Sequence, residues 1–173
     1  MSDINGQVDS QSLSSTASVQ TVVDSHNRIA TFAADNTQTA PDVADYINIG
    51  VSGVDTVNLS DVNQQVDAQS LNTIANVQTM VTSLNVIELY AADNTQTAPS
   101  VSDYSNVGVA GVTASNLADV NAQVDGQSLS TITNVQTLVS SLNVIEAYAA
   151  DNTEAAPSET DFINVGVSGV SAA

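Results

Sequence analysis

Carboxylate and amide side chains gather at three evenly spaced turns, and oxygen atoms of this kind could bind Ca²⁺. The turns read Asp35-Asn36-Thr37, Asp93-Asn94-Thr95 and Asp151-Asn152-Thr153-Glu154. They lack the glycine and terminal glutamate of an EF-hand loop, and the glycine-rich nonapeptide of other calcium repeats is absent. We therefore expect turns that end helices. Weak, non-specific Ca²⁺ binding would follow from the charge of the chain alone.

The single histidine, His26, and the single basic residue, Arg28, lie close together near the N-terminus. A binding site there is one interpretation, but a lone histidine without a repeated partner argues against catalysis. The corresponding later positions are apolar, so we expect instead that this helix packs differently or has no neighbour on that side. These apolar residues are Leu84, Val86, Leu142 and Val144.

Cysteine is absent, no base stands near the serines, and no glycine loop could cradle a phosphate. The sequence therefore predicts no catalytic, cofactor-binding or metal-binding residue. It predicts a protein that is not an enzyme.

Asparagines and aromatic residues also recur, and neither set forms a catalytic pattern. Asparagines recur as Asn5, Asn63 and Asn121, and as Asn27, Asn85 and Asn143; aromatic residues recur as Tyr46, Tyr104 and Phe162, and as Phe32, Tyr90 and Tyr148. The asparagines are expected to fix helix register by hydrogen bonds, although loop capping or exposure to water would also fit. Phenylalanine at the tyrosine positions predicts core packing with a dispensable hydroxyl, rather than ligand stacking.

These features repeat because the chain is three copies of a 58-residue unit. The prolines are Pro41, Pro99 and Pro157, one in each copy. We divide the chain into residues 1–12, a partial third helix of a preceding unit; 13–70, repeat 1; 71–128, repeat 2; and 129–173, repeat 3 without its third helix. Both ends cut through a unit, so we expect an excerpt of a longer array with Met1 supplied for expression.

Each repeat is expected to contain a long, a short and a third helix. The long helix follows from apolar residues spaced by three and four: Ile74, Val77, Val81, Leu84, Ile87 and Ala91. It should span about 18–20 residues, with Thr73 or Asn72 as N-cap and an end near Asp93-Asn94. A short helix follows, with Pro99 in its first turn and Gly108 after its end.

The third helix is expected to begin at Thr113, or at Asp55 in the first repeat, with a stripe of Leu117, Val120 and Val124. Abundant Val and Thr favour strands, and Val109–Thr113 could form a short one. The apolar spacing typical of a helix occurs at corresponding sites of the second and third repeats, and it outweighs this preference for strands. The sequence predicts an all-α fold of tandem three-helix bundles, with a continuous α-solenoid as the alternative.

Charge excludes several classes of function. The chain has 19 acidic residues, one basic residue and a formal net charge of −18. Nucleic-acid binding and docking on anionic membranes both need basic residues. No apolar run is long enough to insert into a membrane. Hydrophobic residues make up 42% of the chain, which is enough for packed cores, and we expect a monomer whose contacts are with neighbouring repeats of its own chain.

The units resemble GA-like three-helix tandem repeats of very large bacterial cell-surface adhesins. The resemblance rests on Asn76–Thr79, Ser83–Ile87, Tyr90–Asp93, Ala98-Pro99, Asp103-Tyr104, Gly108-Val109, Gly111–Thr113, Asn116-Leu117 and Val120-Asn121. It implies a secreted, extracellular, surface-held protein that takes part in cell adhesion and biofilms, in which the repeats are spacers that project adhesive domains. The near absence of Lys and Arg departs from the pattern, and no albumin-binding surface can be matched.

Two functions stay open from the sequence. A structural spacer fits near-identical units that repeat one geometry. The alternative is a repeated module that binds a host protein, a glycan or a cation.

Overall fold

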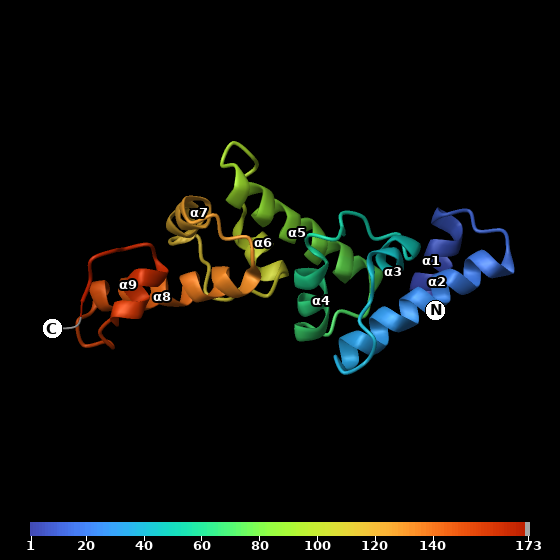
Figure 1. Cartoon of the computed structure of the whole chain (residues 1–173), viewed down its shortest axis with the longest axis horizontal. Coiled ribbons are helices and arrows are strands. Elements are labelled where there is room, and N and C mark those ends of the chain that lie inside the picture. The colour runs from blue at the N-terminus through green and yellow to red at the C-terminus, as the bar shows by residue number, and fades with distance from the viewer. Residues whose placement is uncertain (172–173) are drawn as a thin grey trace. The chain divides into compact units, whose positions relative to one another are not determined.

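The computed structural model describes residues 1–171, which form nine α-helices and no strand (Figure 1). The helices are α1 (Ser2–Ser10), α2 (Thr16–Ala34), α3 (Val43–Asn48), α4 (Leu59–Ala68), α5 (Ile74–Ala92), α6 (Val101–Asn106), α7 (Leu117–Gly126), α8 (Ile132–Ala150) and α9 (Glu159–Asn164). The prediction of an all-α fold is confirmed.

The helices form three repeated units of about 58 residues, namely α2–α4, α5–α7 and α8–α9. Each begins with a long helix and continues with a short one. The first two units end with a third helix, to which α1 corresponds in sequence at the N-terminus. The 58-residue repeat of the sequence is therefore a repeat of the structure.

By contacts the chain divides into two compact units, Met1–Leu84 and Asn85–Ala173. The division falls inside α5, so it does not follow the sequence repeats. In the first unit α2 packs against α1, α3 and α4, and in the second α8 packs against α7 and α9. A third helix thus contacts the long helix that follows it, as in an α-solenoid, and α4 also contacts the one before it.

The long helices have the predicted length and caps. Each of α2, α5 and α8 spans 19 residues. The hydroxyls of Ser15, Thr73 and Thr131 accept hydrogen bonds from the amide three residues later. A side-chain acceptor here satisfies an amide that has no partner within the helix, which explains the start of each helix and confirms Thr73 as the N-cap.

The short helices begin with capping boxes. Ser100 and Asp103 exchange hydrogen bonds at the start of α6, and Asp42 with Asp45 and Ser158 with Asp161 do the same at α3 and α9. The prediction for Pro99 was wrong, because this residue precedes the N-cap Ser100. Gly108 lies just after the helix with φ of 78°, a left-handed conformation that favours glycine, as predicted.

The third helices begin later than predicted, at Leu59 and Leu117. Asp55 accepts hydrogen bonds from the amides of Val57 and Asn58, so it caps a turn that leads into the helix. The buried amides of Asn58 and Asn116 donate to the carbonyls of Gly53 and Gly111 and hold this turn in place. Their positions explain why α4 and α7 start after the turn.

The core is built from the apolar stripes of the three kinds of helix, as the spacing predicts. Residues with no more than 1% of their surface exposed include Tyr46, Val62, Val66, Val77, Met80, Val81, Leu84, Ile87, Tyr104, Val107, Val120, Val124, Val135, Leu138 and Val139. The link after α6 is partly buried through Val109. The core positions the polar side chains described next.

Candidate functional site

In each acidic turn after a long helix, the aspartate carboxylate accepts hydrogen bonds from other residues of the same turn. Asp93 Oδ1 accepts hydrogen bonds from the backbone N–H and hydroxyl of Thr95, at 3.0 and 2.8 Å, and its Oδ2 accepts from Gln96 Nε2. The Thr95 amide, then the side chains of Gln96 and Thr95, hold the pKa of Asp93 below its ordinary value. Asp35 and Asp151 repeat the geometry with Thr37 and Thr153, and their pKa is lowered too. The prediction of a helix-ending turn is confirmed.

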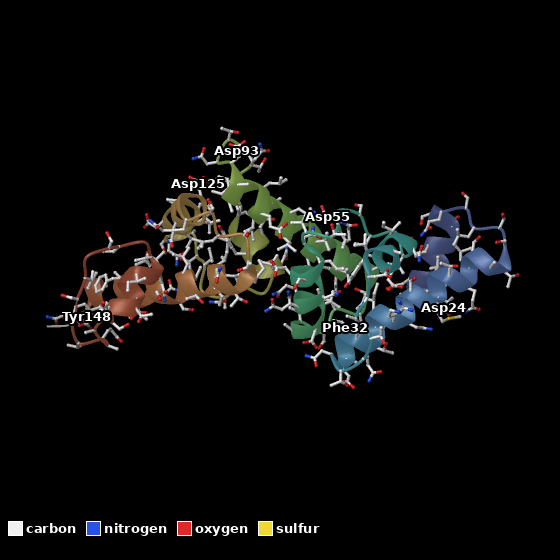
Figure 2. The ribbon with its side chains drawn as sticks, in the orientation of Figure 1. Asp24, Phe32, Asp55, Asp93, Asp125 and Tyr148 are labelled. Atoms are coloured by element: carbon white, nitrogen blue, oxygen red, sulfur yellow. The ribbon has the colours of Figure 1, made fainter. Side chains whose placement is uncertain are left out.

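The turns are also fastened to the third helix of the same repeat. Asn94 Nδ2 donates to Asp125 Oδ2 at 2.9 Å, and Asn36 Nδ2 donates to Asp67 Oδ2 at 2.8 Å. Figure 2 labels Asp125, the acceptor of this bond near the end of α7, and Asp93, the residue before the donor Asn94. Within residues 1–171, no cluster of three His, Cys, Asp or Glu side chains could hold a metal ion.

A buried tyrosine and an asparagine join the short helix to the third helix. Tyr104 donates its hydroxyl to Asn121 Oδ1 at 2.6 Å, and Asn121 Nδ2 donates to the carbonyl of Pro99 at 2.9 Å. Tyr46, Asn63 and Pro41 repeat these contacts in the first repeat. Burial, followed in Tyr104 by the charges of Tyr90 and Asp103, raises the pKa of both tyrosines. Asn63 and Asn121 therefore make hydrogen bonds between two helices, as predicted for these positions.

The prediction of core packing is confirmed at Tyr46 and Tyr104, which have no exposed surface. The hydroxyls of Tyr46 and Tyr104 are the donors of this contact.

The two unusual residues of the first repeat are both paired with carboxylates. Arg28 Nη1 lies 3.1 Å from Asp45 Oδ2, and His26 Nε2 lies 3.7 Å from Asp3 Oδ2. Asp3 Oδ2 also accepts from the backbone N–H of Ile74, at the start of α5. The sequence suggested altered packing here, and the structure shows an ion pair of Arg28 with Asp45 and places the His26 ring near the Asp3 carboxylate.

Glutamine side chains join consecutive repeats at a second recurring contact, which we call the glutamine seam. Gln78 of α5 accepts from Ser52 N at 2.8 Å and donates to Ser52 O at 3.2 Å. Gln136 of α8 makes the same pair of bonds to Ala110, at 2.7 and 3.1 Å. Each pair imitates the exchange of hydrogen bonds between two strands. It fixes the link after one short helix to the next long helix.

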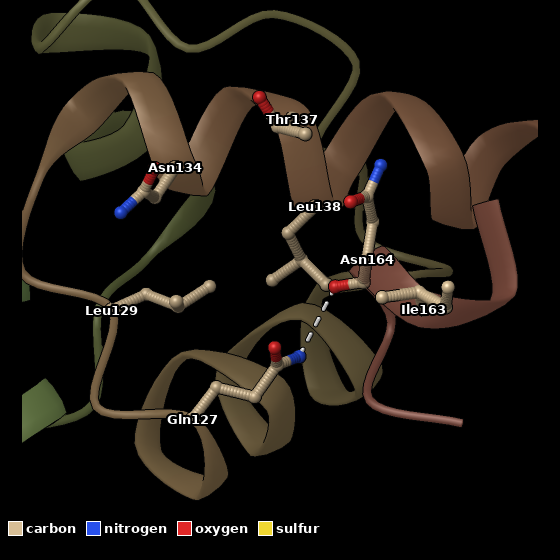
Figure 3. A pocket seen from close by; sticks show the side chains of 7 residues that line it. All are labelled: Gln127, Leu129, Asn134, Thr137, Leu138, Ile163 and Asn164. Atoms are coloured by element: carbon tan, nitrogen blue, oxygen red, sulfur yellow. Dashed lines mark hydrogen bonds between the residues drawn. The ribbon is translucent and has the colours of Figure 1, made fainter. Parts of the chain in front are cut away.

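A surface pocket occurs at equivalent places in the first and third repeats. Each has a volume of about 260 Å³. One is lined by Gln11, Leu13, Ser18, Thr21, Val22 and Asn48, and the other by Gln127, Leu129, Asn134, Thr137, Leu138, Ile163 and Asn164. In both, the glutamine Nε2 donates to the backbone carbonyl of the asparagine, at 3.0 and 3.2 Å (Figure 3). The named lining residues are uncharged.

Neither the contacts of Gln78 and Gln136 nor the pocket is predicted from the sequence. The recurrence of these glutamines could have pointed to them. Gln78 and Gln136 occupy equivalent positions, and so do Gln11, Gln69 and Gln127. What the sequence lacks is the pairing of positions that lie 26 and 37 residues apart.

Comparison with known proteins adds no relative. No protein-family model, curated protein or solved structure matches the chain. Within the residues described, no helix is long and apolar enough to cross a membrane.

Proposed function

We propose that the chain is a structural spacer. The observation that carries this proposal is the recurrence of the same hydrogen bonds from one repeat to the next. The Tyr–Asn–Pro contact, the carboxylate turn and the glutamine seam each occur at equivalent positions. A chain that repeats its internal contacts and its joints adds a fixed geometry with every repeat.

The glutamine seams supply the joint that a spacer needs. Gln78 and Gln136 each make two bonds to one backbone residue, which resists rotation about the link better than a single bond would. α7 also packs against the long helix that follows it, α8. In this proposal, packed and hydrogen-bonded groups join one repeat to the next.

We extend the proposal to the setting that the resemblance implies. The repeats would belong to a secreted bacterial surface adhesin and would project its adhesive domains from the cell, in adhesion and biofilm formation. The partners would be neighbouring repeats, with no nucleic acid and no membrane insertion. The charge of −18 suits such a setting, because a Debye length of about 8 Å at physiological salt screens repulsion along the array.

Salt dependence checks this role for the charge. Screening should stabilise the fold, so the melting temperature should rise as NaCl increases from a few millimolar to physiological strength. Sodium sulfate at equal ionic strength separates screening from specific ion binding. A melting temperature that does not change with salt concentration would contradict this role for the charge.

Small-angle X-ray scattering tests the spacer directly, on data extrapolated to zero protein concentration. If each repeat adds about 30 Å, the length of one long helix, this chain should span roughly 80–100 Å. A second copy of residues 71–128 inserted after Ser128 should lengthen it by about 30 Å. A radius of gyration near 16 Å, as expected for one globule of this length, would contradict the proposal.

A repeated binding module is the second candidate, and the equivalent pockets favour it. Their amide, hydroxyl and apolar lining suits a neutral ligand such as a glycan better than a cation. Titration with neutral oligosaccharides, followed by amide chemical shifts, should move resonances of Thr21 and Thr137 together. If neither resonance moves with any of the oligosaccharides tested, the binding module is excluded.

A further inference from the structure

The two equivalent pockets keep the same side chains at positions that face solvent. Thr21 and Thr137 are exposed and lie inside long helices, where threonine is less favourable than alanine or leucine. By contrast, the exposed Leu89 of α5 corresponds to Ala147 of α8. Neither folding nor solubility requires the threonine, so its recurrence points to a role for the pocket. The shared lining residues are Gln11 and Gln127, Leu13 and Leu129, Thr21 and Thr137, and Asn48 and Asn164.

The pocket is a feature of the repeat itself. In the first repeat it is present while α2 packs against α1, α3 and α4. In the third repeat it is present while α8 packs against α7 and α9. It occurs in the first repeat with a third helix packed after the short one, so such a helix does not close it.

In the pocket of the third repeat, hydrogen-bond donors are used within the protein. Gln127 Nε2 has two hydrogens, and it donates to the carbonyl of Asn164 and to Gln123 Oε1, both at 3.2 Å. The hydroxyl of Thr137 donates to the carbonyl of Thr133 at 2.9 Å. The atoms left for a ligand are therefore two acceptors, the glutamine Oε1 and the threonine Oγ1.

The pocket of the first repeat has the same arrangement. Gln11 Nε2 donates to Gln7 Oε1 at 2.9 Å and to the carbonyl of Asn48 at 3.0 Å. The hydroxyl of Thr21 donates to the carbonyl of Ala17 at 3.1 Å. Both pockets thus favour a ligand that brings its own O–H and N–H donors.

The apolar part of the pocket is aliphatic. In the third repeat it is formed by Leu129, Leu138 and Ile163, which lie above Gln127 in the view of Figure 3. Leu138 is 1% exposed and Ile163 is 55% exposed, so a buried floor adjoins an open apolar rim. The named lining residues include no aromatic ring on which the face of a sugar could stack, and no charge that could pair with a cation. A small aliphatic group such as a methyl suits this wall.

We propose that the pocket binds an N-acetylated sugar. The acetamido methyl would contact Leu129 and Ile163, the acetamido N–H would donate to the glutamine Oε1, and a ring hydroxyl would donate to the threonine Oγ1. A volume of about 260 Å³ is below the ~300–1,000 Å³ of most ligand pockets, so it fits one sugar residue. This inference rests on the binding module, the second candidate function, and names its ligand.

A sugar is favoured over a peptide. A peptide bound through its backbone adds to the edge of a sheet, and residues 1–171 contain no strand. A helical peptide needs an extended apolar groove, whereas amide and hydroxyl groups make up much of this lining.

Titration of the whole chain with three sugars, followed by amide chemical shifts, tests the proposal. Glucose, glucosamine and N-acetylglucosamine differ at one carbon, which carries a hydroxyl, an ammonium or an acetamido group. N-acetylglucosamine should shift Thr21 and Thr137 with a Kd of about 1 mM, as expected for so small a ligand. Glucose should bind about fourfold more weakly, the effect of leaving one methyl group unburied. N-acetylalanine amide, the peptide probe, should bind no better than glucose.

One substitution tests the apolar rim. Ile163→Ser introduces the residue that the second repeat has at the equivalent position, Ser105, so the chain itself tolerates it. The preference for N-acetylglucosamine over glucose should disappear at Thr137 and persist at Thr21, which serves as a control within the same molecule. Val167→Ser changes a residue that is 45% exposed and does not line the pocket, and it should alter neither. Circular dichroism confirms that each variant is folded.

The outcomes separate this inference from the function on which it rests. Equal affinities for glucose and N-acetylglucosamine would overturn the inference and leave the binding module in place. It would also be overturned if glucosamine bound most tightly, in a way that NaCl weakens, or if the peptide probe bound as tightly as the sugar. No shift with any sugar would exclude both the inference and the binding module, while the spacer is tested separately by scattering.

Discussion

The first and third repeats carry the same pattern of residues but bury it differently. Ile29, Phe32 and Ala33 of α2, the helix against which α4 packs, are at most 7% exposed. Ile145, Tyr148 and Ala149 of α8 are partly or fully exposed. The first half of α8 is nevertheless buried by α7 and α9, with Val135 and Val139 at 0%. The comparison shows that a long helix acquires its core in two halves, from the third helix before it and the one after it.

The largest expected effect is a difference between two equivalent isoleucines. Ile87→Ala removes a side chain with no exposed surface and should cost about 3 kcal/mol of unfolding free energy. Ile145→Ala acts at the open face and should cost about 1 kcal/mol or less. Urea unfolding followed by circular dichroism measures both losses. Ile47→Ala, at a residue 60% exposed, is the control, and equal losses for the first two variants would break the comparison.

The tyrosine contact sharpens the same comparison. Tyr104→Phe leaves the buried Asn121 oxygen without its donor and should cost about 1–2 kcal/mol. Phe162→Tyr adds a hydroxyl to a ring that is partly exposed, so stability should change little. Thermal unfolding measures both variants, with Tyr46→Phe as a second case of the first kind. The contact would lose its proposed role if Tyr104→Phe were neutral.

Arg28 is a feature of the first repeat alone, and its loss should have a smaller effect. Here Asp42 replaces the serine N-cap, so two carboxylates share one capping box and Arg28 balances them. Arg28→Val should cost about 1 kcal/mol, because Arg28 is half exposed while Asp45 is 6% exposed.

A double variant tests this explanation. Arg28→Val with Asp42→Ser restores the combination found in the later repeats, and the loss should be smaller than for Arg28→Val alone. Chemical denaturation of the two single variants and the double variant gives the coupling. Additive losses would mean that Arg28 does not serve the capping box.

The smallest effect concerns the carboxylate turns and depends on pH. Hydrogen bonds lower the folded-state pKa of Asp93, so this carboxylate stabilises the fold above its unfolded pKa of about 3.8. This stabilisation is lost as pH falls through the lower folded-state value. The melting-temperature difference between wild type and Asp93→Asn should therefore be full at pH 7 and shrink below about pH 4.

Burial raises the pKa of Asp61, which acts in the opposite direction, but this contribution is common to both chains and cancels in the difference. A difference that stays constant or grows at pH 2.5 would contradict the assignment of the Asp93 hydrogen bonds.

The sequence predicted the helices well, because local rules determine them. The stripe from Ile74 to Ala91 and the cap Thr73 follow from helical spacing and from the need of the first amides for acceptors. The start of the third helix was missed because the buried Asn58 and Asn116 favour a preceding turn through contacts with Gly53 and Gly111.

The recurring polar contacts were predicted only in part. The role of Asn63 and Asn121 was foreseen, but not that a tyrosine hydroxyl is their donor. The seam of Gln136 with Ala110 could not be foreseen, since it depends on packing between segments 26 residues apart.

The central claim is that each long helix is completed by the third helix that follows it. Residue-resolved amide hydrogen exchange tests this claim most directly, because it reports the protection of each helical segment separately. The claim predicts slow exchange through the second half of α5, around Ile87, and much faster exchange at the equivalent positions of α8, from Asn143 to Ala150. Equal protection of these two segments would contradict it.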